Sequence, residues 1–314
     1  MLKDLLEKNI CFKLVCGAGN EDIEEIKRLV YIYSLAGCKF FDLSANTDVI
    51  KSAKDAIKLA NIKDAYLCVS VGIKNDPHVT KAVIDQTKCI NCGACEAVCA
   101  QSAIHNGTVK KVRCIGCGRC WKSCSRMAIS YISEEKNLKE VLPPIIDLGI
   151  DCIEFHAMGN NEKEINAKWQ YINEIFDGIL SICTSRGKLS DEDLVNRIKK
   201  MTKNRKPYST IIQADGFPMS GGEDDYKSTL QAVATAEIVY NEKLPLYIML
   251  SGGTNTKTSN LAKMCNINYN GIAVGSYARK IIKKYIDSED FWINSETIDN
   301  AVQTAKKLVN TVVI

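Results

Sequence analysis

Two runs of four cysteines carry the plainest chemistry in this chain. Each run has the spacing C-x2-C-x2-C-x3-C, and a short segment separates the two. Three thiolates at this spacing can wrap one face of an iron–sulfur cubane, while the fourth cysteine ligates the other cluster. The spacing therefore predicts two [4Fe–4S] clusters with crossed ligand sets: Cys89, Cys92, Cys95 and Cys124 for one, and Cys114, Cys117, Cys120 and Cys99 for the other.

This duplicated spacing is the pattern of two-cluster bacterial ferredoxins. Zinc would need only four ligands and would leave half of each run unexplained. Disulfides would imply a secreted protein, which nothing else in the chain supports. The proline that commonly follows the fourth cysteine is absent, since Ala100 and Ser125 stand there. Gly93, Gly116 and Gly118 suit a crowded loop whose amides donate to cluster sulfurs.

A second group of chemically useful residues falls at the ends of predicted strands, with a spacing of two. The pairs are Asp42 with Ser44, Glu154 with His156, Ser181 with Cys183, and Gln213 with Asp215. Side chains two apart share one side of a strand, so these pairs could meet in a polar pocket. Asp215, Glu154 and His156 are the acid–base candidates, although each alone could be a hydrogen-bonded loop cap. The glycines of segment 215–222 could let that loop close over a ligand.

Glycine-rich segments follow the last two predicted strands. The candidate binding residues there are Gly252, Gly253, Thr254, Asn255, Gly275, Ser276 and Arg279. Backbone amides at such glycines, together with a helix that starts near Ser276, could bind phosphate. Flavin mononucleotide (FMN) or a phosphorylated substrate would use this site. The alternative is that the glycines only form tight turns.

The elements that must position these residues alternate between strand and helix. The predicted strands are Phe12–Cys16, Cys38–Leu43, Ala65–Val71, Asp151–His156, Gly178–Cys183, Ser209–Asp215, Leu246–Leu250 and Gly271–Gly275. Eight such units predict an α/β fold, a (β/α)8 TIM-type barrel, with an open doubly wound sheet as the alternative. The cysteine-rich segment then forms a ferredoxin-like insert after strand three, beside the barrel mouth. The predicted domains are residues 1–75 and 133–314 for the barrel and 76–132 for the insert.

Composition and charge restrict the partners and the cellular location that we expect for the protein. The net charge of +4 over 314 residues gives no argument for nucleic acid, and aromatic residues are few near the cysteines. Between Pro77 and Tyr131 there are eight basic and only two acidic residues. This excess of positive charge would attract an acidic redox partner or simply keep the lobe soluble. We expect no signal peptide, no membrane span and a cytoplasmic location. The other seven cysteines are expected to be mostly buried free thiols.

Five segments occur together with the double cluster motif: Val15-Cys16-Gly17-Ala18, Glu154-Phe155-His156, Gln213-Ala214-Asp215-Gly216-Phe217-Pro218-Met219-Ser220-Gly221, Gly252-Gly253-Thr254-Asn255 and Gly275-Ser276-Tyr277-Ala278-Arg279-Lys280. With these segments, the chain resembles the LdpA family of light-dependent period modulators. The resemblance implies a redox-responsive iron–sulfur protein associated with passing redox state to a circadian clock. No residue identifies a clock partner.

Three functions fit these observations. In the first, the clusters carry electrons to or from a ligand, such as FMN, at the barrel mouth, which would make the chain an oxidoreductase. In the second, the protein is a redox sensor without turnover that signals to a partner. The third is a lyase-like barrel with structural clusters; no lysine sits clearly at a predicted strand end, which disfavours Schiff-base chemistry. Four candidate thiolates per cluster argue against radical S-adenosylmethionine chemistry.

Overall fold

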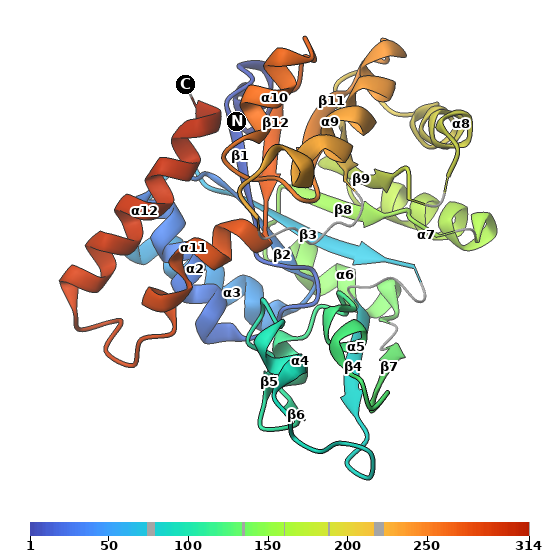
Figure 1. The fold of residues 1–314 in the computed structure, drawn as a ribbon. Helices are drawn as coiled ribbons and strands as arrows, with labels where there is room; N and C mark the ends of the chain where they lie inside the picture. The colour runs from blue at the N-terminus through green and yellow to red at the C-terminus, as the bar shows by residue number, and fades with distance from the viewer. Residues whose placement is uncertain (74–78, 134–135, 160, 188, 217–222, 314) are drawn as a thin grey trace.

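Eight parallel strands close into a barrel in the computed structural model, which describes residues 1–73, 79–133, 136–159, 161–187, 189–216 and 223–313 (Figure 1). Around the barrel the strands run in the order β1-β12-β11-β10-β9-β8-β3-β2. The barrel strands are β1 (Cys11–Val15), β2 (Phe40–Ser44), β3 (Tyr66–Gly72), β8 (Cys152–His156), β9 (Ile179–Ser185), β10 (Thr210–Asp215), β11 (Tyr247–Ser251) and β12 (Gly271–Val274).

Helices surround this barrel and complete its βα units. They are α1 (Leu2–Glu7), α2 (Ile23–Leu35), α3 (Thr47–Leu59), α6 (Leu138–Asp147), α7 (Glu162–Ile175), α8 (Asp191–Thr202), α9 (Tyr226–Asn241), α10 (Thr258–Met264), α11 (Ser276–Ile286) and α12 (Ser295–Val313). Several begin at a side chain that accepts a backbone N–H of the first turn, such as Asp22 for α2, Ser190 for α8 and Asp225 for α9. The two C-terminal helices, drawn in red in Figure 1, lie beside α2.

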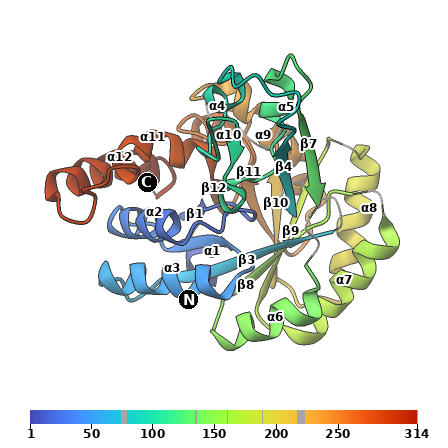
Figure 2. The same cartoon turned by 90° about the horizontal axis from the view of Figure 1, so that it is seen from below.

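The cysteine-rich lobe is a separate small unit between β3 and α6. Its elements are β4 (Thr80–Ile84), α4 (Ala94–Ala97), β5 (Ile104–His105), β6 (Thr108–Val109), the 3-10 turn η2 (Lys111–Arg113), α5 (Arg119–Ser123) and β7 (Ile129–Ser133). Strand β4 pairs with β7 and β5 pairs with β6, both antiparallel. In Figures 1 and 2 the lobe stands outside the ring of barrel strands.

Apolar packing divides the molecule into three parts. One core lies between the barrel strands and their surrounding helices. A second fills the amino-terminal end of the barrel, where Leu2 and Leu6 of α1 pack with inward residues such as Phe40 and Met249. The third belongs to the lobe and includes Ala82 and Ile129. The carboxyl-terminal end of the barrel is therefore left for polar side chains.

The predicted fold is confirmed: the barrel is closed and the open sheet is excluded. The ends of the predicted strands lie within two residues of the observed ends, and helix α6 continues through Pro143 and Pro144. The predicted boundary between residues 132 and 133 falls inside β7, and the boundary at 75 and 76 lies outside the described residues. Six of the seven scattered cysteines are buried, whereas Cys265 is exposed. Within the described residues, the structure contains no helix that is long and apolar enough to cross a membrane.

Candidate functional site

The two predicted cysteine sets line two separate hollows in the lobe. The outer hollow is lined by Cys89, Cys92, Cys95 and Cys124, with Ile90 and Arg126 at its edge. The inner hollow is lined by Cys99, Cys114, Cys117 and Cys120. The chain thus brings together the crossed sets that the spacing predicts, including the exchange of each fourth cysteine. Ligation of a cluster by each set stays a prediction.

The surroundings of these sulfurs fit thiolate ligands. Backbone N–H groups point at four of them, from Asn91 to Cys89 (3.4 Å), Ala103 to Cys99 (3.3 Å), Ala82 to Cys114 (3.3 Å) and Ala128 to Cys124 (3.4 Å). Such donors stabilise negative charge on sulfur. Gly93 and Gly118 adopt left-handed conformations just before α4 and α5, which a side chain would strain. Four convergent sulfurs in each hollow therefore suit a [4Fe–4S] cluster.

A pocket of about 270 Å³ lies between the inner hollow and the barrel mouth. The lobe contributes Gln101, Ile115, Gly116, Cys117 and Lys122 to its lining. The barrel contributes the carboxyl ends of its strands, including Asp42, Glu154, His156, Cys183, Gln213, Asp215 and Ser251. Cys117, a predicted cluster ligand, and the predicted acid–base residues thus line the same pocket.

Lys13 occupies the centre of the barrel, below this pocket. Its ammonium group lies 2.5 Å from Oε2 of Glu154, 3.2 Å from Oδ2 of Asp42 and 3.1 Å from Oε1 of Gln213. Only 1% of the lysine side chain is exposed. Burial alone would lower the pKa of Lys13, but Asp42 and Glu154 hold it well above the usual value. The lysine is therefore a fixed cation and not a Schiff-base nucleophile.

Glu154 is held ionised by its neighbours. Besides Lys13, it accepts hydrogen bonds from Gln213 (2.8 Å) and Ser181 (3.1 Å), and Nε2 of His156 lies 3.1 Å away. Burial opposes ionisation, but Lys13 and His156 together bring the pKa of Glu154 well below its usual value. A carboxylate that accepts this many hydrogen bonds keeps its charge and fixes the side chains at the bottom of the pocket, here called the pocket floor. We therefore favour Asp215 over Glu154 as the group that gains and loses a proton.

Asp215 has the environment of an acid–base residue. Burial raises the pKa of this carboxyl to about 6, although hydrogen bonds from Cys183 and Ser251 oppose the shift. Asp215 is the last residue of β10, lines the pocket and is only 3% exposed. A pKa near neutrality lets a group exchange protons at physiological pH. Of the segment 215–222, which was predicted to close over a ligand, Asp215 ends β10 and residues 217–222 lie outside the described residues.

The glycine-rich loops line the pocket, but their glycines have a structural role too. A side chain at Gly253 would collide with the carbonyl oxygen of Ser228, and one at Gly252 would press on the backbone of Gly216. Thr254 donates to the carbonyl of Ala273 at 2.5 Å. Asn255 donates to the carbonyls of Glu223 (3.0 Å) and Asp225 (2.8 Å). The side chains of Thr254 and Asn255 therefore connect neighbouring loops. The backbone N–H groups of the glycine-rich loops remain as the groups that could bind a ligand.

Helix α11 begins at the pocket with Gly275 as its N-cap and Ser276 as its first residue. The unpaired N–H groups of a first helical turn attract anions. Arg279, a predicted phosphate donor, is 3% exposed and bonds elsewhere: its Nε donates to Glu25 at 2.8 Å and its Nη2 to the carbonyl of Cys16 at 2.6 Å. The helix start is thus the better candidate for binding phosphate, while Arg279 fixes α11 to α2.

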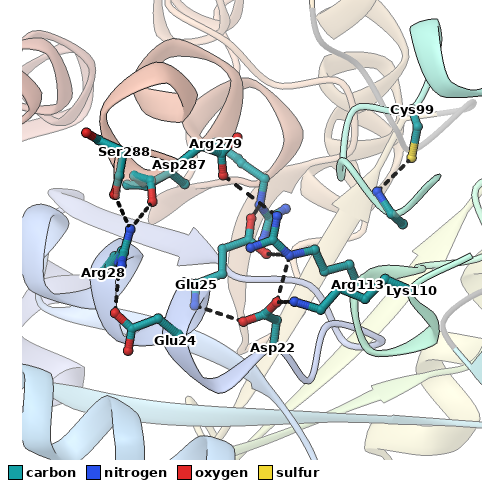
Figure 3. Close-up of polar contacts among 12 residues, drawn as sticks. Asp22, Glu24, Glu25, Arg28, Cys99, Lys110, Arg113, Arg279, Asp287 and Ser288 are labelled. Carbon is teal, nitrogen blue, oxygen red and sulfur yellow. Dashed lines mark hydrogen bonds and ion pairs between the residues drawn. The ribbon is translucent and has the colours of Figure 1, made fainter. Parts of the chain in front are cut away.

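Ion pairs join the lobe to the barrel (Figure 3). Arg113, which precedes the predicted cluster ligand Cys114, places Nε 2.7 Å from Asp22 and 3.6 Å from Glu25. Lys110 also pairs with Asp22, the N-cap of α2. Burial opposes ionisation of Asp22, but these two cations lower its pKa to about 2. Because Glu25 also binds Arg279, the junction extends from the inner hollow to the helix at the pocket.

Sequence reasoning missed two buried residues of this site. Lys13 lies within a predicted strand and is followed by apolar residues. This pattern alone did not indicate that its side chain points to the barrel axis. Gln101 follows the first cysteine run and contacts the pocket from the lobe. The signal for Lys13 was the rarity of a lysine in a buried strand; none existed for Gln101. His105 is exposed and pairs with Glu96, as expected for the surface, and His78 lies outside the described residues.

Fold and site together define a class of protein, a (β/α)8 barrel with a ferredoxin-type iron–sulfur lobe. Residues 82–105 match the 4Fe-4S binding domain family, and residues 144–311 match the family described as "Light dependent period A C-terminal domain". Since the second match covers more than half of the chain, this protein belongs to the LdpA family. A similar protein is "Light dependent period A" of Synechococcus elongatus, which is 29% identical over 98% of this chain and 92% of its own length.

Among solved structures, the likeness to one aldolase supports the barrel fold and nothing further. The YdjI aldolase of Escherichia coli K12 aligns with 97% of this chain and 90% of its own at a TM-score of 0.51 and 8% identity. A geranylgeranylglyceryl phosphate synthase, GGGPS of Thermoplasma volcanium, aligns with 99% and 97% at a TM-score of 0.49 and 10% identity. At 8% identity the likeness to the YdjI aldolase indicates the fold and not the reaction.

Proposed function

We propose that this iron–sulfur protein transfers electrons between two [4Fe–4S] clusters and a ligand in the pocket at the barrel mouth. One observation carries the proposal: Cys117 of the inner hollow and Asp215 of the barrel line the same 270 Å³ pocket. The clusters would supply one-electron transfer next to residues that bind and protonate a ligand. The ligand we favour is FMN, with its phosphate at the start of α11 and the backbone of Gly252 and Gly253.

The chain's own residues would divide the remaining work. Asp215 would exchange a proton with the ligand, because its pKa of about 6 allows both charge states near neutrality. Lys13 and Glu154 would hold the pocket floor in a fixed charge state. The lobe would close the pocket from above and limit the access of water. Together these roles would couple each electron to a proton at one place.

Electrons would reach the protein at the outer hollow. Cys92 is exposed there, and 63% of the side chain of Ile90 is accessible. Three of the lobe's basic residues, Lys81, Lys110 and Arg113, bind the barrel. Arg126 lies at the edge of the outer hollow, where it would attract an acidic redox partner. We therefore propose that such a partner docks over the outer cluster.

The test begins with anaerobic purification and analysis of bound iron, sulfide and flavin. Protein with both clusters is then reduced anaerobically with one electron equivalent of dithionite per cluster, mixed with FMN, and followed by the absorbance of clusters and flavin. We expect fast oxidation of the clusters by FMN in the wild-type protein and its loss in Cys117→Ser. FMN reduction at the same rate in Cys117→Ser would overturn the proposal.

The phosphate position has a separate test. Ser276→Asp adds a negative charge at the first residue of α11, where an acidic residue stabilises a helix but repels phosphate. We expect at least tenfold weaker FMN binding, measured by calorimetry, with riboflavin binding unchanged. Ser295→Asp at the start of α12 is the matched control. Equal loss for FMN and riboflavin would place the phosphate elsewhere.

A redox sensor is the second candidate, and the ion-pair junction favours it. Arg113 adjoins the cluster ligand Cys114 and is linked through Glu25 to Arg279 of α11. A change of cluster charge or geometry would act on this chain of charges and move the pocket helix. The sensor requires no turnover. Redox-dependent binding of a partner without any FMN reduction would favour it over the first proposal.

A further inference from the structure

Lys122 is the charged residue that the described part of the lobe contributes to the lining of the 270 Å³ pocket. It belongs to α5 and lies in sequence between Cys120 of the inner set and Cys124 of the outer set. The residue is exposed, and within the part of the chain that the structure describes no hydrogen bond or ion pair engages its ammonium group. The lysine is therefore open to a ligand in the pocket.

The charges of the pocket lining leave Lys122 uncompensated. Arg279 is the other lysine or arginine among the described lining residues, and Glu25 pairs with its Nε atom at 2.8 Å. Of the carboxylates in the lining, Asp42 and Glu154 pair with Lys13 at the pocket floor. A negatively charged group of a ligand would therefore be attracted to the side of the pocket where the lobe presents Lys122.

The start of α11 in the same pocket does not balance the charge of a phosphate group by itself. Gly275 is the N-cap of α11, and among the described residues no side chain caps the first turn. A helix start supplies the equivalent of about +0.5 charge, whereas a phosphate monoester carries about −1.5 to −2 charge at neutral pH. A phosphate bound there needs a further cation, and the lobe provides one in Lys122.

The geometry points to Lys122 as a specificity-determining residue, and we propose that it binds the phosphate group of the pocket ligand together with the start of α11. FMN and a phosphorylated sugar would both supply this group. The inference rests on the proposed function, which locates phosphate at α11, and adds the residue that selects a phosphorylated ligand over an uncharged one. Such a ligand would bridge the barrel and the lobe, so its binding would require the two to be in place together.

Lys122→Met tests the inference because it removes the charge from an exposed side chain and keeps most of its length. We expect the cluster-loaded variant to bind FMN about tenfold more weakly than wild type, a loss of about 1.4 kcal/mol, measured by anaerobic calorimetry. Riboflavin, which lacks the phosphate, should bind both proteins equally, and Lys122→Arg should retain the affinity for FMN. Lys88→Met is the matched control, because Lys88 is an exposed lobe lysine that pairs with Asp85 and does not line the pocket.

Glycerol phosphate is a second probe, since it carries the phosphate group without a flavin ring. We expect wild-type protein to bind it and Lys122→Met to bind it about tenfold more weakly. If wild type binds glycerol phosphate in this Lys122-dependent way but does not bind FMN, the inference stands and the flavin part of the proposed function fails.

The remaining outcomes decide against the inference. If wild type prefers FMN to riboflavin and Lys122→Met keeps that preference, the inference is wrong and the proposed function stands. An equal loss of FMN and riboflavin in Lys122→Met, or an equal loss of FMN in Lys88→Met, would show a general effect and overturn the inference. If wild type binds neither phosphate compound, or binds FMN no more tightly than riboflavin, the inference fails together with the proposed phosphate position.

Discussion

At the scale of single residues, Lys13 balances the buried negative charges of the pocket floor. Its ammonium group is the cation between two buried carboxylates, Asp42 and Glu154. Removing one partner of a buried ion pair leaves the other charge uncompensated. We expect Lys13→Met to lower the free energy of unfolding by about 3–5 kcal/mol, measured in denaturant. Lys13→Met combined with Glu154→Gln should recover part of that loss. An unchanged midpoint in the single variant would contradict the assigned ion pair.

Asp215 should give the protein a pH-dependent stability. Its pKa of about 6 lies above the ordinary 3.8, so its contribution to stability is complete below pH 4 and is lost as pH rises through 6. Asp215→Asn lacks this titration. Between pH 5 and pH 8 the variant should therefore gain about 1–1.5 kcal/mol relative to wild type, measured by urea unfolding. The same slope in both proteins would exclude the raised pKa, and exposed Asp55→Asn serves as control.

The residues that sequence alone could predict are those with a pattern. Cysteine spacing indicated both ligand sets, and polar pairs at strand ends indicated Asp215 and Glu154. Lys13 could not be assigned in this way because its role depends on Asp42 and Glu154, which come from other strands. Gln101 is in a loop without periodicity. Sequence also could not rank Asp215 above Glu154, since their pKa values diverge through neighbours that only the folded barrel brings close.

At the scale of elements, Arg113 should control how firmly the lobe is attached to α2. A backbone hydrogen bond of 2.6 Å from the N–H of Glu21 to the carbonyl of Val112 crosses the same junction. Arg113→Gln removes the ion pair with Asp22 and should accelerate amide exchange of Glu21 about tenfold, because opening of the junction becomes easier by about 1.4 kcal/mol. Hydrogen exchange followed by mass spectrometry or NMR measures this effect.

A neighbouring arginine supplies the control for that prediction. Arg28 pairs with Glu24 on the same helix and donates to the carbonyls of Ile286 and Ser288, on the barrel side (Figure 3). Arg28→Gln should leave exchange at Glu21 unchanged while it loosens the end of α11. Equal acceleration by both variants would mean that exchange reports the stability of α2 as a whole and not the attachment of the lobe.

The barrel elements were predictable because each strand is an apolar run and each helix an amphipathic repeat. The lobe elements were not. Strands β5 and β6 have two residues each, which is too short for any period, and the helices α4 and α5 have four and five. Their positions follow instead from the turns that the cysteines and Gly93 and Gly118 impose. In these four short elements, cysteine and glycine turns therefore take the place of hydrophobic patterning.

At the scale of the whole molecule, the lobe and the barrel have separate cores, so a lesion at the outer hollow should stay local. We expect Cys92→Ser to lose about half of the iron, one cubane of two, and to keep the circular dichroism of the barrel. Iron analysis and far-ultraviolet spectra measure both. Full iron content in Cys92→Ser would contradict the ligand assignment. Loss of the barrel spectrum would contradict the independence of the cores.

The polar pocket was expected from the strand ends, but the part of its lining that the lobe contributes was beyond sequence analysis. An insert after strand three was expected beside the barrel mouth, and this position is what the structure shows. The face that the insert turns toward the barrel was not predictable. It is set by contacts such as Lys81 with the carbonyl of Gly19 (2.5 Å), between residues far apart in sequence. Only this orientation makes the cysteine set of Cys117 the inner one.

The place of the lobe in the chain also sets an order of events during synthesis. Strands β3 and β8 are hydrogen-bonded neighbours, with Cys68 opposite Cys152, yet the whole lobe is translated between them. The last barrel strand, β12, closes the ring against β1 only when nearly the entire chain has emerged. Since domains that emerge first generally fold first, we expect the lobe to be complete while the barrel ring is still open.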